Sequence, residues 1–240
     1  MQPEQIKSNR SAKPNRQQLV VVIADNSSSM YGPKAEAAVE GIENMIIECQ
    51  TKGREQSLYR VLLIVFADKA TIHSECKRTP VMEIDTDKIS FRGDGGGTNM
   101  RAALRLAHSQ ISEYLDEISN HPQKSKHPLP LVIFFSDGRN GYQDPKPAAK
   151  ALKALTYDSL PILIFTAGVA VGDNDRPDEE MLKSIASTHN GHPLYVPVQD
   201  VSVLAHFLAD AGSSAASTAA EAFDILRNYW KPHGFLGHSE

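Results

Sequence analysis

Cysteine is scarce in this chain, with two residues, Cys49 and Cys76, among 240. Two thiols cannot form the framework of disulfides that stabilises many small secreted domains. Cys49 lies on the apolar side of an expected helix, and we interpret it as a small buried thiol. The nine histidines are scattered without metal-ligand spacing, so the sequence does not indicate a zinc site of cysteine and histidine.

Long apolar segments and an excess of basic charge are also missing. No run of apolar residues is long enough to span a membrane, and residues 1–18 lack the apolar centre of a signal peptide. The 25 Lys and Arg residues are outnumbered by 29 Asp and Glu residues, whereas general nucleic-acid binding requires a basic surface. We therefore expect a cytoplasmic protein with neither a membrane nor a nucleic acid as its partner.

The chain has the length and composition of one large globular domain. Its 240 residues can bury a sizeable core, and 41% hydrophobic with 22% charged residues is typical of folded domains. Residues 1–17 hold four basic residues and one acid, and we expect them to form a flexible arm. We place the folded domain at residues 18–213 and a C-terminal helix or tail at residues 214–240.

Expected buried strands alternate with amphipathic helices along this domain. Nearly continuous apolar runs, typical of strands covered on both faces, occupy Leu19–Ala24, Arg60–Phe66, Leu131–Phe135, Ile162–Thr166 and Leu194–Val196. Helical patterns extend over about Pro33–Gln50, Asn99–Ser119, Pro147–Leu155, Asp178–Ser187, Val201–Ala211 and Ala219–Trp230. Because only a short turn precedes Thr71–Cys76, we expect this segment to pair antiparallel with the second strand at the sheet edge. The predicted fold is α/β, with a doubly wound, Rossmann-like, mostly parallel sheet and helices on both faces.

Oxygen-bearing side chains gather in three loops, each at the carboxyl end of an expected strand or just before a helix. The first loop is Asp25-x-Ser27-x-Ser29, the second is a glycine-rich turn that ends in Thr98, and the third is Ser136-Asp137-Gly138. With the strand order 3-2-1-4-5-6, the first and fourth strands flank the topological switch point, where open α/β sheets bind their ligands. We therefore expect the three loops to converge.

Together, Asp25, Ser27, Ser29, Thr98 and Asp137 present two carboxylates and three hydroxyls. Oxygen-only ligands suit a hard cation, and a compact, near-octahedral shell favours Mg²⁺, with Mn²⁺ or Ca²⁺ as alternatives. Two carboxylates can at most neutralise a divalent ion, so an open coordination position would attract a further anionic oxygen. An Asp or Glu side chain of a partner protein would supply that oxygen.

The order and placement of these residues resemble the metal-ion-dependent adhesion site (MIDAS) of von Willebrand factor A (VWA) domains. The similarity covers roughly Leu19 to Ala211, and its three elements are Asp25-x-Ser27-x-Ser29, Thr98 after the glycine-rich turn, and Asp137. Within this family, the chain looks like the bacterial TerY-type proteins, which are linked to tellurite resistance and to gene triads with a kinase and a phosphatase.

The resemblance implies a non-catalytic module for protein–protein interaction. Ser27 and Ser29 would ligate the metal directly, and Thr98 would do so directly or through water. Asp25 and Asp137 would lie in or just behind the innermost ligand sphere, and a partner's carboxylate would take the sixth position. In the TerY-like subgroup the partner would be a kinase or phosphatase of a stress or signalling system, while the oligomeric state stays open.

Two other functions are left open by the sequence. An enzyme of the phosphotransfer class could use Asp25 as an acceptor, but Ser27 stands where a haloacid-dehalogenase-like phosphatase has a second Asp. The acidic pair of a receiver domain, a P-loop and a G-x-S-x-G nucleophile elbow are all missing. The remaining alternative is a structural domain whose metal site is inactive.

Further acidic residues have simpler interpretations. Asp94 stands among glycines, where a turn residue is expected. Asp173, Asn174, Asp175 and Asp178 superficially resemble a calcium loop, but the glycine and terminal Glu of an EF-hand are missing. We interpret Asp178 as the cap of the helix that follows it.

Overall fold

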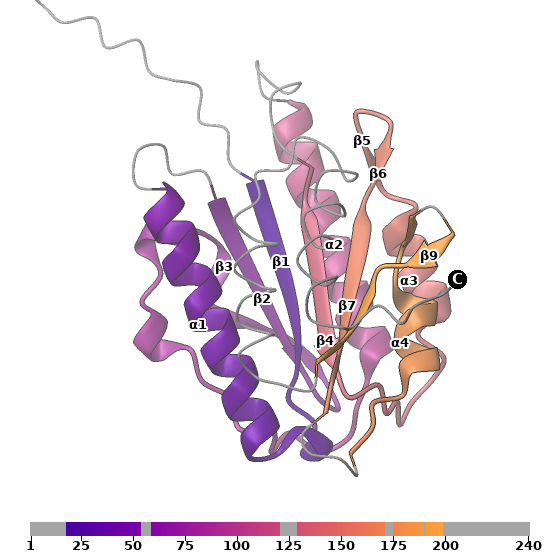
Figure 1. Cartoon of the computed structure of the whole chain (residues 1–240). Helices are drawn as coiled ribbons and strands as arrows, with labels where there is room; N and C mark the ends of the chain where they lie inside the picture. The colour runs from indigo at the N-terminus through magenta and orange to yellow at the C-terminus, as the bar shows by residue number, and fades with distance from the viewer. Residues whose placement is uncertain (1–17, 54–58, 121–128, 171–174, 190, 199–240) are drawn as a thin grey trace, which may run out of the picture.

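A six-stranded sheet forms the centre of the fold in the computed structural model, which describes residues 18–53, 59–120, 129–170, 175–189 and 191–198 (Figure 1). Its strand order is β10-β7-β4-β1-β2-β3. The strands are β1 (Gln18–Asp25), β2 (Tyr59–Phe66), β3 (Ala70–Pro80), β4 (Leu131–Ser136), β7 (Leu163–Val169) and β10 (Tyr195–Val198). The predicted arm at residues 1–17, the tail at 214–240 and the helices at Val201–Ala211 and Ala219–Trp230 lie outside the described residues.

The direction of the strands confirms the predicted doubly wound sheet. β1 pairs parallel with both β2 and β4, β4 pairs parallel with β7, and β7 pairs parallel with β10. β3 pairs antiparallel with β2 at the end of the sheet, as predicted for the segment around Thr71–Cys76. The switch point therefore lies between β1 and β4, where connections leave the sheet in opposite directions.

Helices cover both faces of the sheet, because side chains of each strand alternate between the two faces (Figure 1). Val20, Val22 and Ala24 of β1 belong to a core cluster with the buried side of α1 (Pro33–Gly53). Leu19, Val21 and Ile23 belong to a second cluster on the opposite face. That second cluster includes residues of α2 (Met100–Ser119), α3 (Lys146–Lys153) and α4 (Glu179–Ile185).

The apolar stripe predicted for α2 is confirmed. The apolar residues at helical spacing are all buried, namely Met100, Ala103, Leu104, Ala107, Ile111, Leu115 and Ile118. The side chain of Asn99 caps the helix by accepting a hydrogen bond from the backbone N–H of Ala102 at 3.1 Å. None of the described helices is both long enough and apolar enough to cross a membrane.

The fifth strand was predicted at Ile162–Thr166, which ends too early. The observed strand β7 continues through Gly168 to Val169. A β-carbon at Gly168 would lie 2.5 Å from the hydroxyl oxygen of Tyr195, on the neighbouring strand β10. The glycine is therefore a packing requirement within the sheet, not a break in it.

Several short elements were not predicted. Two hairpins of two-residue strands pair β5 (Thr156–Tyr157) with β6 (Leu160–Pro161) and β8 (Thr188–His189) with β9 (His192–Pro193). The turn of the first hairpin places Asp158 at φ 50° and Ser159 at φ 66°, the left-handed region usually marked by Asn or Gly. Single turns of 3-10 helix occur at η1 (Ser28–Met30), η2 (Val81–Glu83) and η3 (Thr86–Lys88).

Candidate metal centre

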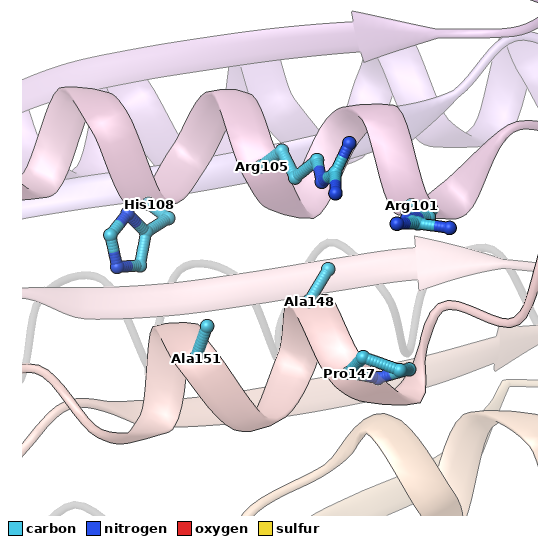
Figure 2. Close-up of a pocket in the computed structure, with 6 residues that line it drawn as sticks. All are labelled: Arg101, Arg105, His108, Pro147, Ala148 and Ala151. Atoms are coloured by element: carbon cyan, nitrogen blue, oxygen red, sulfur yellow. The ribbon is translucent and has the colours of Figure 1, made fainter.

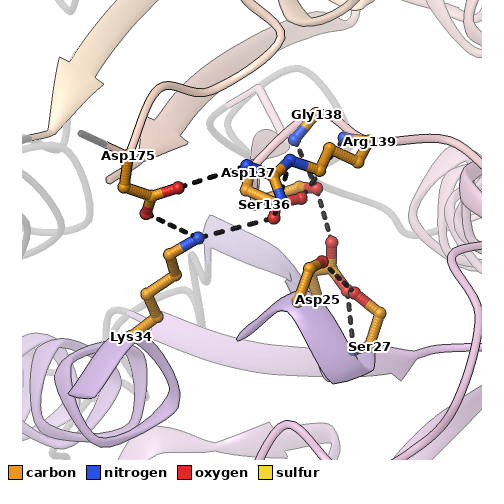
Figure 3. Close-up of polar contacts among 9 residues, drawn as sticks. Asp25, Ser27, Lys34, Ser136, Asp137, Gly138, Arg139 and Asp175 are labelled. Carbon is orange, nitrogen blue, oxygen red and sulfur yellow. Dashed lines mark hydrogen bonds and ion pairs between the residues drawn. The ribbon is translucent and has the colours of Figure 1, made fainter. Parts of the chain in front are cut away.

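Asp25 stands at the carboxyl end of β1 with no exposed surface, and both of its carboxylate oxygens accept hydrogen bonds. Oδ1 accepts the backbone N–H of Ser27 at 2.8 Å, and Oδ2 accepts the hydroxyl of Ser136 in a short bond (Figure 3). Ser136 ends β4, 111 positions along the chain from Asp25. This bond joins the first and third polar loops directly.

Ser27 and Ser29 present their hydroxyls together at this edge of the sheet. The two Oγ atoms lie 3.1 Å apart, and η1 begins immediately after Ser27. A single turn of 3-10 helix brings residues two apart in sequence onto neighbouring sides of a tight loop. The Asp-x-Ser-x-Ser pattern therefore forms one compact turn.

Backbone hydrogen bonds hold the glycine-rich turn against this loop. The N–H of Ser28 donates to the carbonyl of Gly96 at 2.9 Å, and the N–H of Gly95 donates to the carbonyl of Asn26 at 2.9 Å. The side-chain oxygen of Asn26 also accepts the N–H of Gly93 at 2.6 Å. Asn26 stands at a spacer position of the Asp-x-Ser-x-Ser pattern, and its hydrogen bonds hold the second loop against the first.

Thr98 follows this turn and is buried, with 6% of its surface exposed. Its carbonyl accepts the N–H of Gly141 at 3.1 Å, which connects the glycine-rich turn to the loop after β4. Within the described part of the chain, the hydroxyl of Thr98 has no hydrogen-bond partner. The three polar loops are thus mutually hydrogen-bonded, and the hydroxyl of Thr98, which has no hydrogen-bond partner among the described residues, lies among them.

Asp137 directly follows β4 and, like Asp25, has no exposed surface. Its Oδ1 accepts the N–H of Arg139 at 3.2 Å. Its Oδ2 lies 3.5 Å from Nζ of Lys34 and 3.8 Å from Nε of Arg139. Asp175 completes the group, because its carboxylate lies 2.7 Å from Lys34 and 3.3 Å from Arg139 (Figure 3).

Burial is the largest influence on the protonation of Asp25. It raises the pKa of this carboxyl from 3.8 to about 6, because the surroundings disfavour a charge. The hydrogen bonds from Ser136 and Ser27 lower the pKa in part, and the nearby charge of Asp137 raises it further. A divalent cation beside these two carboxylates would reverse this balance by favouring the charged form.

The chemistry of the donor groups fits a hard cation. Two buried carboxylates and three hydroxyls meet at the switch point, and all are oxygen donors. Among the described residues, no group of three or more His, Cys, Asp or Glu side chains has the arrangement of a metal site. The hydroxyl-rich loops are therefore the candidate, while Asp173 and Asn174 of the calcium-like segment lie outside the described residues.

Two exposed tyrosines and a shallow cavity surround this candidate site. Tyr31 is 71% exposed directly after η1, and Tyr142 is 49% exposed in the loop after β4. The hydroxyl of Tyr142 donates to Asp68 at 2.7 Å, and the same carboxylate accepts the N–H of Gly97. On the side of β2 and β3, a cavity of about 380 Å³ is lined by Asn26, Val65, Thr71, His73, Ser90, Phe91, Arg92 and Asp94.

Some of these contacts were missed at the sequence level. Ser136 was noted only as part of a loop, and its role as the partner of Asp25 depends on the pairing of β1 with β4. Lys34 was not singled out in the sequence, yet only 8% of its surface is exposed. Asp178 does cap α4, as predicted, by accepting the N–H of Met181 at 3.1 Å.

A doubly wound sheet with an Asp-x-Ser-x-Ser loop at its switch point defines a class of α/β ligand-binding domains. The chain belongs to the von Willebrand factor type A domain family, whose model matches residues 7–209. No curated protein is significantly similar to the chain in sequence.

Solved structures of several proteins share the fold. Proximal thread matrix protein 1 from the mussel byssus has a TM-score of 0.60 at 16% identity, over 85% of this chain and 49% of that chain. Another structure of the same protein, described with a zinc-occupied MIDAS motif, has a TM-score of 0.59 at 17% identity, over 85% and 48%. The pilus adhesin SpaC from Lactobacillus rhamnosus GG, in its open conformation, has a TM-score of 0.55 at 14% identity, over 90% and 31%.

These likenesses show the fold alone, because identities of 14–17% support no conclusion about individual residues. The chain spans about half of the length of the byssus protein and less than a third of the adhesin.

Proposed function

We propose that this VWA domain is a non-catalytic interaction module that binds one divalent cation at Asp25, Ser27, Ser29, Thr98 and Asp137. The cation would recruit a carboxylate from an Asp or Glu side chain of a partner protein. The observation that carries this proposal is the hydrogen-bonded junction of the three loops, which gathers these side chains at one edge of the sheet. A bound cation would supply the positive charge that attracts the partner's oxygen.

The donors differ in how freely they can reach a cation. The hydroxyls of Ser27 and Ser29 lie at the turn, 3.1 Å apart, and the Ser27 side chain also hydrogen-bonds the carboxylate of Asp25. Both oxygens of Asp25 already accept hydrogen bonds, which favours a role through water or through charge. The hydroxyl of Thr98 makes no hydrogen bond to another described residue and is available as a further ligand.

The charge of the site supports recruitment of an anion. The carboxylates of Asp25 and Asp137 can neutralise a divalent cation only when both are ionised. Lys34 already pairs with Asp137 and offsets part of its negative charge. The cation would therefore keep an excess of positive charge. That excess would be relieved by an acidic side chain from outside the domain.

The surroundings of the site suit a protein partner. Tyr31 and Tyr142 are exposed beside the loops that hold the candidate ligands. Tyrosine is enriched at the energetically important positions of protein interfaces, because it offers a large contact area with a polar tip. A partner that places its carboxylate at the cation would also cover these two rings.

The oxygen-only donor set favours Mg²⁺, with Mn²⁺ or Ca²⁺ as alternatives. The byssus protein with this fold is described with zinc in its MIDAS motif, so zinc belongs among the ions tested. Calorimetric titration of metal-free protein with Mg²⁺, Mn²⁺, Ca²⁺ and Zn²⁺ would rank them.

Asp137→Ala is the decisive variant, because Asp137 lies in a loop after β4 and contributes no apolar packing. We expect the variant to lose measurable Mg²⁺ binding while its circular dichroism spectrum stays unchanged. Asp94→Ala is the matched control: it removes an exposed carboxylate from the glycine-rich turn and should bind Mg²⁺ as the wild type does. Equal Mg²⁺ affinity in wild type and Asp137→Ala would refute the site.

Capture of partner proteins tests the second half of the proposal. A protein retained by the wild type in Mg²⁺ should be released by EDTA and should not bind Asp137→Ala. Thr98→Ala should weaken this complex more than it weakens Mg²⁺ binding alone, because Thr98 would ligate directly when the partner is engaged. Retention that persists in EDTA would show that the partner binds without the metal.

The phosphotransfer alternative makes a different prediction. An aspartyl acceptor at Asp25 would become labelled by a phosphoryl donor, but this carboxylate is fully buried and hydrogen-bonded to Ser136. We expect neither labelling nor phosphatase activity. The TerY-like subgroup, the kinase or phosphatase partner and the cytoplasmic location stay predictions, which identification of the captured protein and its location would test.

A further inference from the structure

A cationic groove lies between α2 and α3, apart from the candidate metal centre (Figure 2). Its volume is about 280 Å³, and its lining comprises Arg101, Arg105, His108, Pro147, Ala148 and Ala151. Arg101, Arg105 and His108 follow one another at helical spacing on one side of α2, and the residues of α3 opposite them are small. The small residues leave space between the two helices for a ligand.

The positive groups of this groove have no carboxylate beside them in the lining. Within the described ranges, Arg105 and His108 take part in no ion pair or side-chain hydrogen bond. Arg101 donates one hydrogen bond from its guanidinium group to the side-chain oxygen of Gln143, while its buried Nε has no partner among the described residues. Guanidinium groups without counter-charges are effective binding groups for anions.

The two helices add to this positive potential. α2 and α3 begin at the same end of the groove, near Arg101 and Pro147 (Figure 2). Neither helix has an acidic residue in its first turn, where one would usually stabilise the helix dipole, but Asp144 just before α3 accepts the backbone N–H of Lys146 at 3.0 Å. Arg101 and Lys146 occupy these first turns instead. The start of α2 therefore favours a bound anion, whereas the start of α3 already has the carboxylate of Asp144 beside it.

We propose that the groove between α2 and α3 binds a phosphate monoester or free phosphate, held by the guanidinium groups of Arg101 and Arg105. A phosphate dianion balances the two permanent charges of the arginines, whereas one carboxylate would balance only one of them. Planar guanidinium groups also match the geometry of phosphate oxygens. His108 adds a third donor farther along the groove.

The size of the groove limits what it can hold. At about 280 Å³ it lies just below the roughly 300–1,000 Å³ that is usual for sites of drug-sized ligands. A free phosphate ion or the end of a phosphorylated side chain fits this volume. This site is independent of the proposed metal centre, because none of its lining residues is a candidate metal ligand.

The test is an NMR titration of ¹⁵N-labelled, metal-free protein with inorganic phosphate. We expect saturable shifts of backbone amides at residues 101–108 and 147–151. Arg105→Gln should weaken binding about tenfold or more, and because Arg105 is exposed, this variant should remain folded. Arg101→Gln should have a similar effect on phosphate affinity.

Arg92→Gln is the matched control, since it removes an exposed arginine from the cavity beside β2 and β3. It should leave phosphate binding unchanged. An equal loss in Arg92→Gln and Arg105→Gln would show a non-specific charge effect and overturn the proposal, as would unchanged affinity in Arg105→Gln. Shifts confined to the loops around Asp25 and Asp137 would also contradict it.

Two further arms identify the source of the phosphate group. A phosphoserine peptide that binds tighter than inorganic phosphate, and tighter than the same peptide with glutamate, would indicate a phosphorylated protein. Binding of inorganic phosphate at least as tight as that of the peptide would indicate a free ion. If the glutamate peptide bound as tightly as the phosphoserine peptide, the proposed preference for a dianion would be refuted.

Discussion

Nζ of Lys34 lies 3.5 Å from Oδ2 of Asp137, although 103 positions separate the two residues in sequence. Lys34 is in the first turn of α1, and Asp137 follows β4, so the contact spans the switch point of the sheet. Asp175 lies closer to the lysine, at 2.7 Å, and holds its ammonium group beside the candidate ligand. The protein thus carries its own positive charge next to the proposed cation.

Replacement of Lys34 by methionine should strengthen metal binding. Methionine keeps most of the length of the side chain but removes a charge that repels a cation near Asp137. We expect the affinity for Mg²⁺ to rise about tenfold, which corresponds to about 1.4 kcal/mol. Without metal, the same variant should melt at a lower temperature, because Asp137 loses a buried partner.

The control for this variant is Lys69→Met, which removes an exposed lysine from the turn between β2 and β3. Calorimetry and melting curves with and without Mg²⁺ separate the two effects. A similar gain of affinity in both variants would mean that general surface charge, and not the contact with Asp137, sets the affinity.

The raised pKa of Asp25 predicts how stability depends on pH when metal is removed. The folded protein binds this proton more tightly, with a pKa of about 6, than the unfolded chain does near 3.8. The contribution of Asp25 to the free energy of unfolding is therefore fully present below pH 4 and is lost as the pH rises through 6. Over this range the contribution of Asp25 lowers the free energy of unfolding by about 3 kcal/mol.

Asp25→Asn isolates this contribution, since other titrating groups are common to both proteins. Denaturant titrations at pH 4, 5, 6 and 7, in buffer freed of divalent ions, should show the variant gaining stability relative to the wild type as the pH rises. Addition of Mg²⁺ at pH 7 should stabilise only the wild type. A stability difference that stays constant over this pH range would contradict the assignment of the raised pKa to Asp25.

Gly138→Ala should destabilise the protein more than Gly32→Ala does. Both glycines have a positive φ, 81° and 76°, which costs a residue with a β-carbon about 1–2 kcal/mol. At Gly138 the new carbon would also lie 2.6 Å from the carbonyl oxygen of Asp178, whereas nothing lies within 4 Å at Gly32. Thermal melting gives the comparison, and equal losses would show that the contact with Asp178 relaxes freely.

Ile23→Ala tests the central position of β1. Ile23 has no exposed surface and belongs to the cluster beneath α2, so its truncation should lower the free energy of unfolding by roughly 2–5 kcal/mol. Met82→Ala, at a side chain that is 46% exposed, should change it by less than about 0.5 kcal/mol. A loss below that value for Ile23→Ala would mean that the strand is not part of the stable core.

The sequence predicted the sheet well because its signals are local. Five apolar runs and their polar ends identify parallel strands, and the short turn after Phe66 identifies the antiparallel edge. The family resemblance rested on the same local patterns, and the match over residues 7–209 confirms the family. Several bounds differed by a few residues, as for β3, which continues to Pro80, and at Gly168, where the strand continues because its neighbour Tyr195, remote in sequence, leaves no room for a side chain.

The candidate site was predicted only in part, for a physical reason. The loops themselves are visible in sequence, but the partners of their side chains come from other strands and helices. Ser136 meets Asp25, Lys34 meets Asp137, and Asp175 meets Lys34 through the tertiary fold, and no spacing rule relates their positions. The left-handed turn at Asp158 and Ser159 was equally invisible, since neither residue is a glycine.

The outer strand β3 has a consequence for self-association. An edge strand can template the addition of another chain and start aggregation. Here its ladder with β2 is interrupted by register shifts at Leu62, and Arg78 has a left-handed backbone at φ 58°. Arg78 is anchored to Glu117 of α2 at 2.7 Å, and the strand ends at Pro80, which has no N–H to donate. This irregular edge is a poor template for another strand, so the fold discourages fibrous assembly along β3.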